Sequence, residues 1–185
     1  MIKSGRKALY RAFGPDPSGW RTRGILASVT DDSGRQIRYF EDYAPGLKVD
    51  CGSFSLSEAE IIAFAKEYDP QPFHIDPVAA AEGPVGGLIA SGWQTTSMMM
   101  RRLVEHFISG ETALGAAGVD EIRWPRPVRP GDTLRVRATV LDARRSRSKP
   151  DRGIVQSFIE ITNGGGEIVM TMKATNFFLT REREG

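Results

Sequence analysis

The chain has a single cysteine, Cys51, and only two histidines among its 185 residues. One cysteine excludes an internal disulfide and any metal site built from several thiolates. The sequence contains no run of about 18 apolar residues, so no membrane-spanning helix is predicted. The N-terminus also lacks the apolar stretch of a secretory signal. These absences predict a reducing, cytoplasmic setting and no membrane partner.

The net charge of the chain is also small. Apolar residues make up 40% and charged residues 26% of the chain, and the formal net charge is +2. These proportions are ordinary for a globular domain, and the net charge is too small to indicate a dedicated nucleic-acid binder. A chain of this length suffices for one core of ordinary size. We therefore expect a single domain with a tail and no nucleic-acid partner.

The tail is expected at the start of the chain. Residues 1–38 are predicted to form an N-terminal extension, followed by one domain over residues 39–182. Residues 1–23 carry six cations against one acid, Asp16, which predicts a poorly ordered basic arm. An organelle-targeting segment is an alternative. Residues 24–30 and 36–40 flank a Gly-containing turn, so they predict a hairpin or an extended lead-in.

Three helices follow in the sequence pattern. The first begins at Ser57, which forms a capping box with Glu60, and is followed by the predicted buried stripe Ile61, Phe64, Ala65 and Tyr68. A short helix is expected over residues 78–82. The longest helix is expected over residues 93–109, with Gly110 as its stop and burial on one side only. Its three consecutive methionines, residues 98–100, are better explained as core than as a cofactor site.

The remainder of the chain has strand patterns. Residues 119–124, 134–140, 154–162 and 168–179 alternate or run apolar, and the last two segments flank an Asn-Gly-Gly-Gly turn. Antiparallel strands that follow one buried helix predict an α+β fold in which the sheet wraps around that helix.

Residues 68–77, Tyr-Asp-Pro-Gln-Pro-Phe-His-Ile-Asp-Pro, carry the strongest chemical signal. His74 lies between two carboxylates, Asp69 and Asp76. Imidazole exchanges protons near neutral pH, and three prolines predict a stiff, non-helical loop that holds a proton-transfer pair in place. An alternative interpretation is a proline-rich turn with a hydrogen-bonded surface histidine.

Three segments resemble motifs of the MaoC-like dehydratases and R-specific enoyl-CoA hydratases. Residues 68–77 resemble the hydratase motif Gly-Asp-x-Asn-Pro-x-His-x-Asp. Residues 89–93, Ile-Ala-Ser-Gly-Trp, resemble the Ala-His-Gly-Met entry into the central helix. Residues 124–134 resemble the Arg-Pro-Val-x-Pro-Gly-Asp-Thr-Leu lead-in to a strand. The resemblance, from about residue 39 to 179, implies the hot-dog fold, with a long helix inside an antiparallel sheet and two or more subunits that pair their sheets.

The resemblance also implies an activity. Such proteins add water to a trans-2-enoyl thioester, or remove it from a 3-hydroxyacyl thioester, of coenzyme A or acyl carrier protein. Asp69 and His74 match the catalytic dyad, and Gly92 matches the glycine whose backbone N–H polarises the thioester carbonyl. Asp76 matches a motif carboxylate without an assigned step. No metal or redox cofactor is implied, since coenzyme A is only the handle of the substrate.

Some positions depart from the family pattern. Tyr68 replaces a glycine, Gln71 an asparagine and Ser91 a histidine. We expect Gln71, Ser91 and Trp93 to contact the substrate, whose identity these changes leave open. Two alternatives remain, a hot-dog acyl-CoA thioesterase and a non-catalytic subunit that binds acyl thioesters.

A basic segment lies between two of the predicted strands. Its cations are Arg144, Arg145, Arg147, Lys149 and Arg152. Coenzyme A carries phosphates, so these residues are candidates for binding them. A solvated loop that connects two strands is the alternative explanation.

Overall fold

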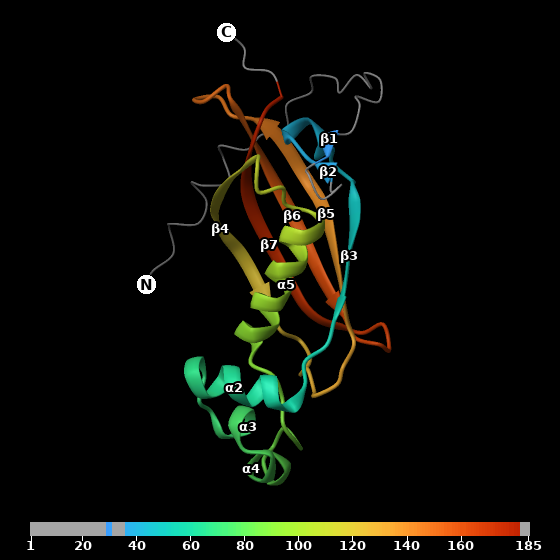
Figure 1. Ribbon diagram of the computed structural model, residues 1–185, viewed down its shortest axis with the longest axis vertical. Coiled ribbons are helices and arrows are strands. Elements are labelled where there is room, and N and C mark those ends of the chain that lie inside the picture. The colour runs from blue at the N-terminus through green and yellow to red at the C-terminus, as the bar shows by residue number, and fades with distance from the viewer. Residues whose placement is uncertain (1–28, 31–35, 182–185) are drawn as a thin grey trace, which may run out of the picture.

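The computed structural model describes residues 29–30 and 36–181 (Figure 1). Strand β1 (Val29–Thr30) pairs antiparallel with β2 (Gln36–Ile37), which confirms the predicted hairpin as far as it is described. The 3-10 helix η1 (Phe40–Asp42) follows. The predicted basic arm, residues 1–23, lies outside the described residues.

Five strands form one antiparallel sheet in the order β3-β5-β6-β7-β4. They are β3 (Lys48–Phe54), β4 (Ala113–Arg123), β5 (Leu134–Arg145), β6 (Arg152–Thr162) and β7 (Ile168–Leu179). The four strands predicted after the long helix are confirmed. Strand β4 begins earlier than predicted, because its Ala- and Gly-rich start shows no apolar alternation. Strand β5 continues past Val140 through an irregularity, where two successive exposed residues interrupt the alternation.

Strand β3 was not predicted. Its ladder with β5 shifts register between Asp50 and Ser53, and Gly52 lies inside the shift with a φ of 76°. That backbone conformation favours glycine. The bulge therefore explains why the segment lacks the regular alternation that marks a strand in sequence.

Helix α2 (Glu58–Tyr68) begins as predicted. The Ser57 hydroxyl accepts a hydrogen bond from the Glu60 N–H at 3.3 Å, and the Glu60 carboxylate accepts one from the Ser57 N–H at 2.8 Å. Ile61 and Ala65 are fully buried, whereas Tyr68 is 64% exposed. Assigning Tyr68 to the buried stripe was therefore wrong, because the ring of this last helix residue meets Phe64 on the preceding turn but otherwise faces solvent.

Helices α3 (Pro72–Ile75), α4 (Pro77–Glu82) and α5 (Gly92–His106) complete the fold. Figure 1 shows α5 along the concave side of the sheet, with β4 and β3 on either side of it and α2, α3 and α4 gathered at one end. This arrangement confirms the predicted α+β architecture and the predicted longest helix. However, α5 ends at His106, before Gly110, because Ser109 already leaves the helix and its hydroxyl accepts from the Arg38 N–H.

The core lies between α5 and the sheet. Met99, Leu103 and Phe107 are buried under the helix, and β6 buries every second residue against it. Met100 and Val104, on the other flank of the helix, are 42% and 43% exposed. The helix is thus buried on one side only, as predicted, and the central methionine belongs to the core.

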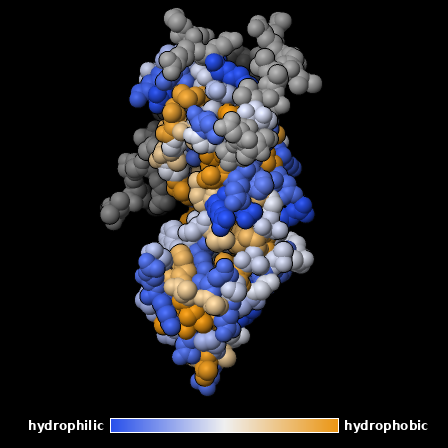
Figure 2. Space-filling model, in the orientation of Figure 1, coloured by the Kyte–Doolittle hydropathy of each residue, from blue (hydrophilic) through white to orange (hydrophobic). Residues whose placement is uncertain are grey.

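The uncovered side of α5 continues onto the edge strand β4. We call this surface the α5–β4 face. Its exposed apolar side chains are Trp93, Met100, Val104, Leu114 and Val119. Figure 2 shows apolar side chains gathered along the middle of this side of the molecule. Within the described residues, no helix has the length and apolar character needed to cross a bilayer.

Candidate active site

A cavity of about 610 Å³ opens where α3, the start of α5 and the segment after β4 meet. Four residues predicted for the site line it: Asp69, His74, Gly92 and Trp93. They come from α3, from the C-terminal end of α2 and from the start of α5. The fold thus brings Gly92 next to Asp69 and His74, which precede it by 23 and 18 positions in the sequence.

His74 lies on α3, a short helix where the sequence predicted a non-helical loop. The helix forms because Pro72 occupies its first position, where the missing N–H costs nothing. His74 is only 5% exposed, so the alternative of a surface histidine is wrong. Its Nδ1 lies 2.7 Å from the carbonyl oxygen of Ile89. Because a carbonyl only accepts, Nδ1 carries the proton, and in the neutral ring Nε2 presents a lone pair.

The other ring nitrogen, Nε2, faces Asp69. His74 Nε2 lies 3.4 Å from Asp69 Oδ2. The Gln71 amide donates to Oδ1 and the Ser91 hydroxyl donates to Oδ2, each at 2.7 Å. The Gln71 amide, the Ser91 hydroxyl and the nearby His74 together lower the pKa of Asp69, against the opposite effect of burial. Asp69 is therefore an ionised carboxylate at neutral pH.

Two residues predicted to contact the substrate, Gln71 and Ser91, donate hydrogen bonds to Asp69, and neither lines the cavity. Ser91 is completely buried and caps α5, since its hydroxyl accepts from the Trp93 N–H while it donates to Asp69. Gln71 is exposed, and its side-chain amide donates a hydrogen bond to Asp69. Asp76, which had no assigned step, caps α4 by accepting from the N–H groups of Val78 and Ala79.

Gly92 begins α5, where the first N–H groups have no partner inside the helix. The Trp124 indole lies against it so closely that a Cβ on Gly92 would be 2.7 Å from the ring. Trp93 and Trp124 also meet edge to face, with ring centroids 5.3 Å apart. Sequence reasoning missed Trp124 and the Ile89 carbonyl, because no local pattern shows which ring or carbonyl reaches the site.

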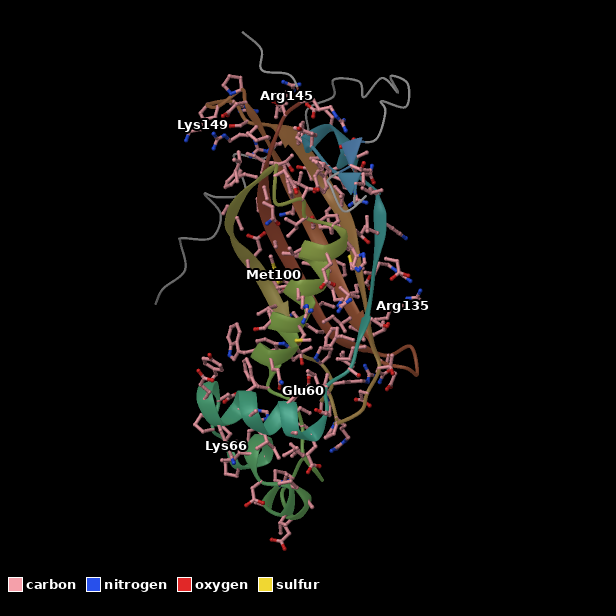
Figure 3. The ribbon with its side chains drawn as sticks, in the orientation of Figure 1. Glu60, Lys66, Met100, Arg135, Arg145 and Lys149 are labelled. Carbon is pink, nitrogen blue, oxygen red and sulfur yellow. The ribbon has the colours of Figure 1, made fainter. Side chains whose placement is uncertain are left out.

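The basic segment lies elsewhere. Figure 3 labels Arg145 and Lys149 at the end of the molecule opposite α2, which carries Glu60 and Lys66. Arg145 pairs with Glu41 at 3.2 Å, and Arg152 pairs with Asp151 at 2.8 Å.

Arg144, Arg145 and Arg152 also belong to strands, and only Arg147 and Lys149 lie in the connection. Within one chain, the cluster therefore lies far from the cavity, and its assignment to coenzyme A phosphates stays a prediction.

The Gln71 contact predicts a pH effect. Gln71→Leu removes the main donor that lowers the pKa of Asp69, so that pKa rises toward its ordinary value. If Asp69 must be ionised for activity, the acid limb of the kcat/KM profile moves to higher pH. Gln156→Leu, which removes an amide that contacts Asp120 instead, is the matched control. An unchanged acid limb in Gln71→Leu would contradict this role.

Ser91→Ala should affect both stability and rate. Loss of the α5 cap costs about 0.5–2 kcal/mol, which lowers Tm by a few degrees, and loss of the bond to Asp69 reduces activity. The rate loss should be smaller than in an Asp69 variant, because the carboxylate itself remains. Ser146→Ala should change neither quantity, because this serine lies outside both hollows and its hydroxyl only accepts from the Lys149 N–H at the far end of the molecule. A Ser91→Ala protein with wild-type Tm and rate would refute the assignment.

The chain matches known proteins over most of this fold. The sequence model of the MaoC-like domain family matches residues 42–160. A MaoC-like dehydratase from Rhodospirillum rubrum is 41% identical, with a TM-score of 0.73 over 79% of this chain and 99% of that protein. An (R)-hydratase from A. caviae is 25% identical, with a TM-score of 0.60 over 72% of this chain and 95% of that one.

Another relative matches a shorter part of the chain. The 3-hydroxyacyl-thioester dehydratase Z of Mycobacterium tuberculosis is 34% identical over 87 residues, which are 46% of this chain and 56% of that protein. A protein from the same organism described as having a double hotdog fold superposes with a TM-score of 0.66 at 17% identity, over 80% of this chain and 46% of that one. The fold is therefore the predicted hot-dog fold, and the chain belongs to the MaoC-like domain family of hydratases and dehydratases.

Proposed function

We propose that this protein adds water to the double bond of a trans-2-enoyl thioester of coenzyme A, and catalyses the reverse dehydration. The observation that carries the proposal is the pair His74 Nε2 and Asp69 Oδ2, 3.4 Å apart on the wall of the cavity. Each of these atoms can accept a hydrogen bond from water when Nδ1 holds the ring proton of His74. A water molecule has two protons to donate, one to each acceptor. The pair therefore suits the binding and activation of one water.

The thioester carbonyl of the substrate would accept a hydrogen bond from the Gly92 N–H. The Gly92 N–H lies at the positive end of the α5 dipole, beside the same cavity. A donor at this position stabilises the negative charge that develops on the thioester oxygen as the enolate forms. Trp124 lies against Gly92 and limits the approach of water to that oxygen.

In the proposed hydration, one proton of the bound water and its oxygen end on neighbouring carbon atoms of the enoyl group. The Asp69–His74 pair takes one proton from the bound water, and the water oxygen forms a bond to carbon 3 of the enoyl group. The electron pair of the double bond moves toward the carbonyl, where the Gly92 N–H holds the enolate oxygen. The proton returns from the pair to carbon 2 on the same face, giving syn addition and a 3-hydroxyacyl thioester. No redox change occurs, and the pair ends in its starting state.

A panel of trans-2-enoyl-CoA thioesters of increasing chain length tests this function. The proposal predicts loss of the absorbance of the conjugated double bond, without release of free thiol. Release of thiol with retained double bond would instead identify a thioesterase. Tight binding of the thioesters with neither change would identify a non-catalytic binding subunit.

We also expect at least a homodimer. Strand β4 is an edge of the sheet, and the α5–β4 face around it exposes Val119, Met100 and Val104. Pairing this face with a second copy removes an exposed edge and buries apolar surface. Light scattering should give at least twice the 20.4 kDa of one chain.

Val119→Lys should weaken this association, because it places a charge on the paired face. Leu141→Lys is the matched control, since Leu141 is also an exposed apolar strand residue but lies on β5, away from that edge. A single-chain mass for the wild type at micromolar concentration would contradict the dimer.

A further inference from the structure

A second hollow lies next to the active-site cavity. It is an apolar groove of about 280 Å³ that runs beneath α5, and Trp93 lines both spaces. Met99, Leu103 and Phe107 form the buried part of its helix side, and Thr96, Ser97 and Met100 form the outer part. Met100 and Val119 also belong to the α5–β4 face, so in the proposed dimer the second copy would form the outer wall of this groove. We call it the α5 groove. Its length follows the helix from the first turn to the last, so it has the shape of a site for an extended chain.

Small and polar residues form part of its sheet side. Ala116 and Gly118 come from β4, Ala174 and Asn176 from β7, and Ser157 from β6. Ser157 pairs with Ala174 across the β6–β7 ladder, and Asn176 lies two residues further along β7, diagonal to Ser157 on the same face. Besides Thr96 and Ser97 on its helix side, the mainly apolar groove thus contains a polar position well inside it.

The Ser157 hydroxyl is unusual among the described residues. Ser157 is 1% exposed, and its Oγ has no hydrogen-bond partner within residues 36–181. A buried hydroxyl without a partner costs about 1–3 kcal/mol. A valine or alanine would fill a purely apolar groove without this cost, so the oxygen is best explained by a partner that enters the groove.

We propose that the α5 groove binds the distal part of the acyl chain, and that Ser157 selects chains carrying an oxygen function, a hydroxyl or keto group, away from the thioester. This inference rests on the proposed function, which puts the thioester carbonyl at Gly92 and the start of the chain at Trp93. From there, the chain passes beneath α5 to Ser157. Its oxygen replaces the missing partner of Ser157 Oγ, and Asn176 supplies a second polar group nearby.

The test compares wild type with Ser157→Ala on matched thioesters. The probes are a medium-chain trans-2-enoyl-CoA and its derivatives with one keto oxygen moved carbon by carbon along the distal half. The measured quantity is the ratio of kcat/KM for each keto derivative to that for the plain chain. We expect one position to be favoured by wild type and Ser157→Ala to lower its ratio about tenfold, the effect of one good buried hydrogen bond. Equal ratios in the two proteins at every position would overturn the proposal.

Ser109→Ala is the matched control. Ser109 is also a buried serine, but its hydroxyl accepts from the Arg38 N–H at 2.8 Å and lies outside both hollows. Its removal should lower Tm and leave the ratios unchanged. Ser157→Ala should keep or raise Tm, because it removes an unpartnered hydroxyl. A fall in Tm as large as that of Ser109→Ala would contradict the absence of a protein partner for Ser157.

Binding measurements separate this inference from the proposed function. Calorimetric titration with the saturated thioesters, plain and keto-bearing, gives the same ratio as a quotient of Kd values and needs no turnover. If no probe is hydrated but the keto preference depends on Ser157, the proposed function fails and the groove assignment stands. If the probes are hydrated without any such preference, the proposed function stands and the groove assignment fails.

Discussion

Replacing either member of the Asp69–His74 pair should abolish hydration of an active thioester. Loss of a proton-transfer group costs about 100- to 10,000-fold in rate, and both groups act on one water. The double variant should therefore be little slower than the slower single variant. Asp69→Asn keeps the shape of the side chain, whereas His74→Ala also removes the donor to the Ile89 carbonyl. The latter should lose about 1–3 kcal/mol of stability, so kcat and Tm are measured together.

The chain offers a matched control for each change. Asp76→Asn alters the other carboxylate beside His74, but asparagine caps a helix about as well as aspartate, so α4 and the rate should survive. His106→Gln alters the only other histidine, which is exposed at the end of α5. Wild-type hydration by both Asp69→Asn and His74→Ala would show that the pair is not the catalytic centre.

Gly92→Val should cause a comparably large loss of activity for a steric reason. Any side chain at Gly92 places its Cβ 2.7 Å from the Trp124 ring, closer than carbon atoms approach in proteins. Either the indole moves into the cavity or the start of α5 moves away from the carbonyl site. Loss of one carbonyl donor typically costs about 100- to 1,000-fold in kcat. Steady-state kinetics on the best thioester of the panel measures this loss.

A second change tests the steric explanation. Trp124→Leu in the Gly92→Ala background shortens the side chain that Cβ would strike, so the double variant should recover part of the activity that Gly92→Ala loses. Trp124→Leu alone shows what the indole contributes by itself. If Gly92→Ala is fully active, the backbone N–H does not need the close approach of Trp124, and this part of the proposed site is wrong.

Local sequence patterns predicted the parts of this structure that local interactions form. The capping box of Ser57 and Glu60, the turn between β6 and β7 and the order of helices and strands depend on neighbours within a few residues. The predictions were wrong where packing against residues distant in the sequence determines burial or the end of a helix. Tyr68 continues the apolar rhythm of α2 but faces solvent, and α5 ends early because Ser109 contacts Arg38.

In the candidate site, too, local patterns predicted the residue types but not the contacts between distant segments. Asp69 and His74 stood out because their residue types and spacing match proton-transfer chemistry. The bonds that prepare them for it join segments far apart in the chain: Ser91 to Asp69 and Ile89 to His74. The basic segment shows what a local pattern leaves out, since charge in a sequence does not reveal at which end of a sheet it will lie.

Hydration in water labelled with heavy oxygen tests the central claim most directly. The protein is incubated with a trans-2-enoyl-CoA in labelled water, and the products are analysed by mass spectrometry. The account predicts one label in the hydroxyl group at carbon 3 of an intact thioester, and no labelled product with Asp69→Asn. Label in a free carboxylate, or unchanged enoyl-CoA with the wild-type protein, would contradict it.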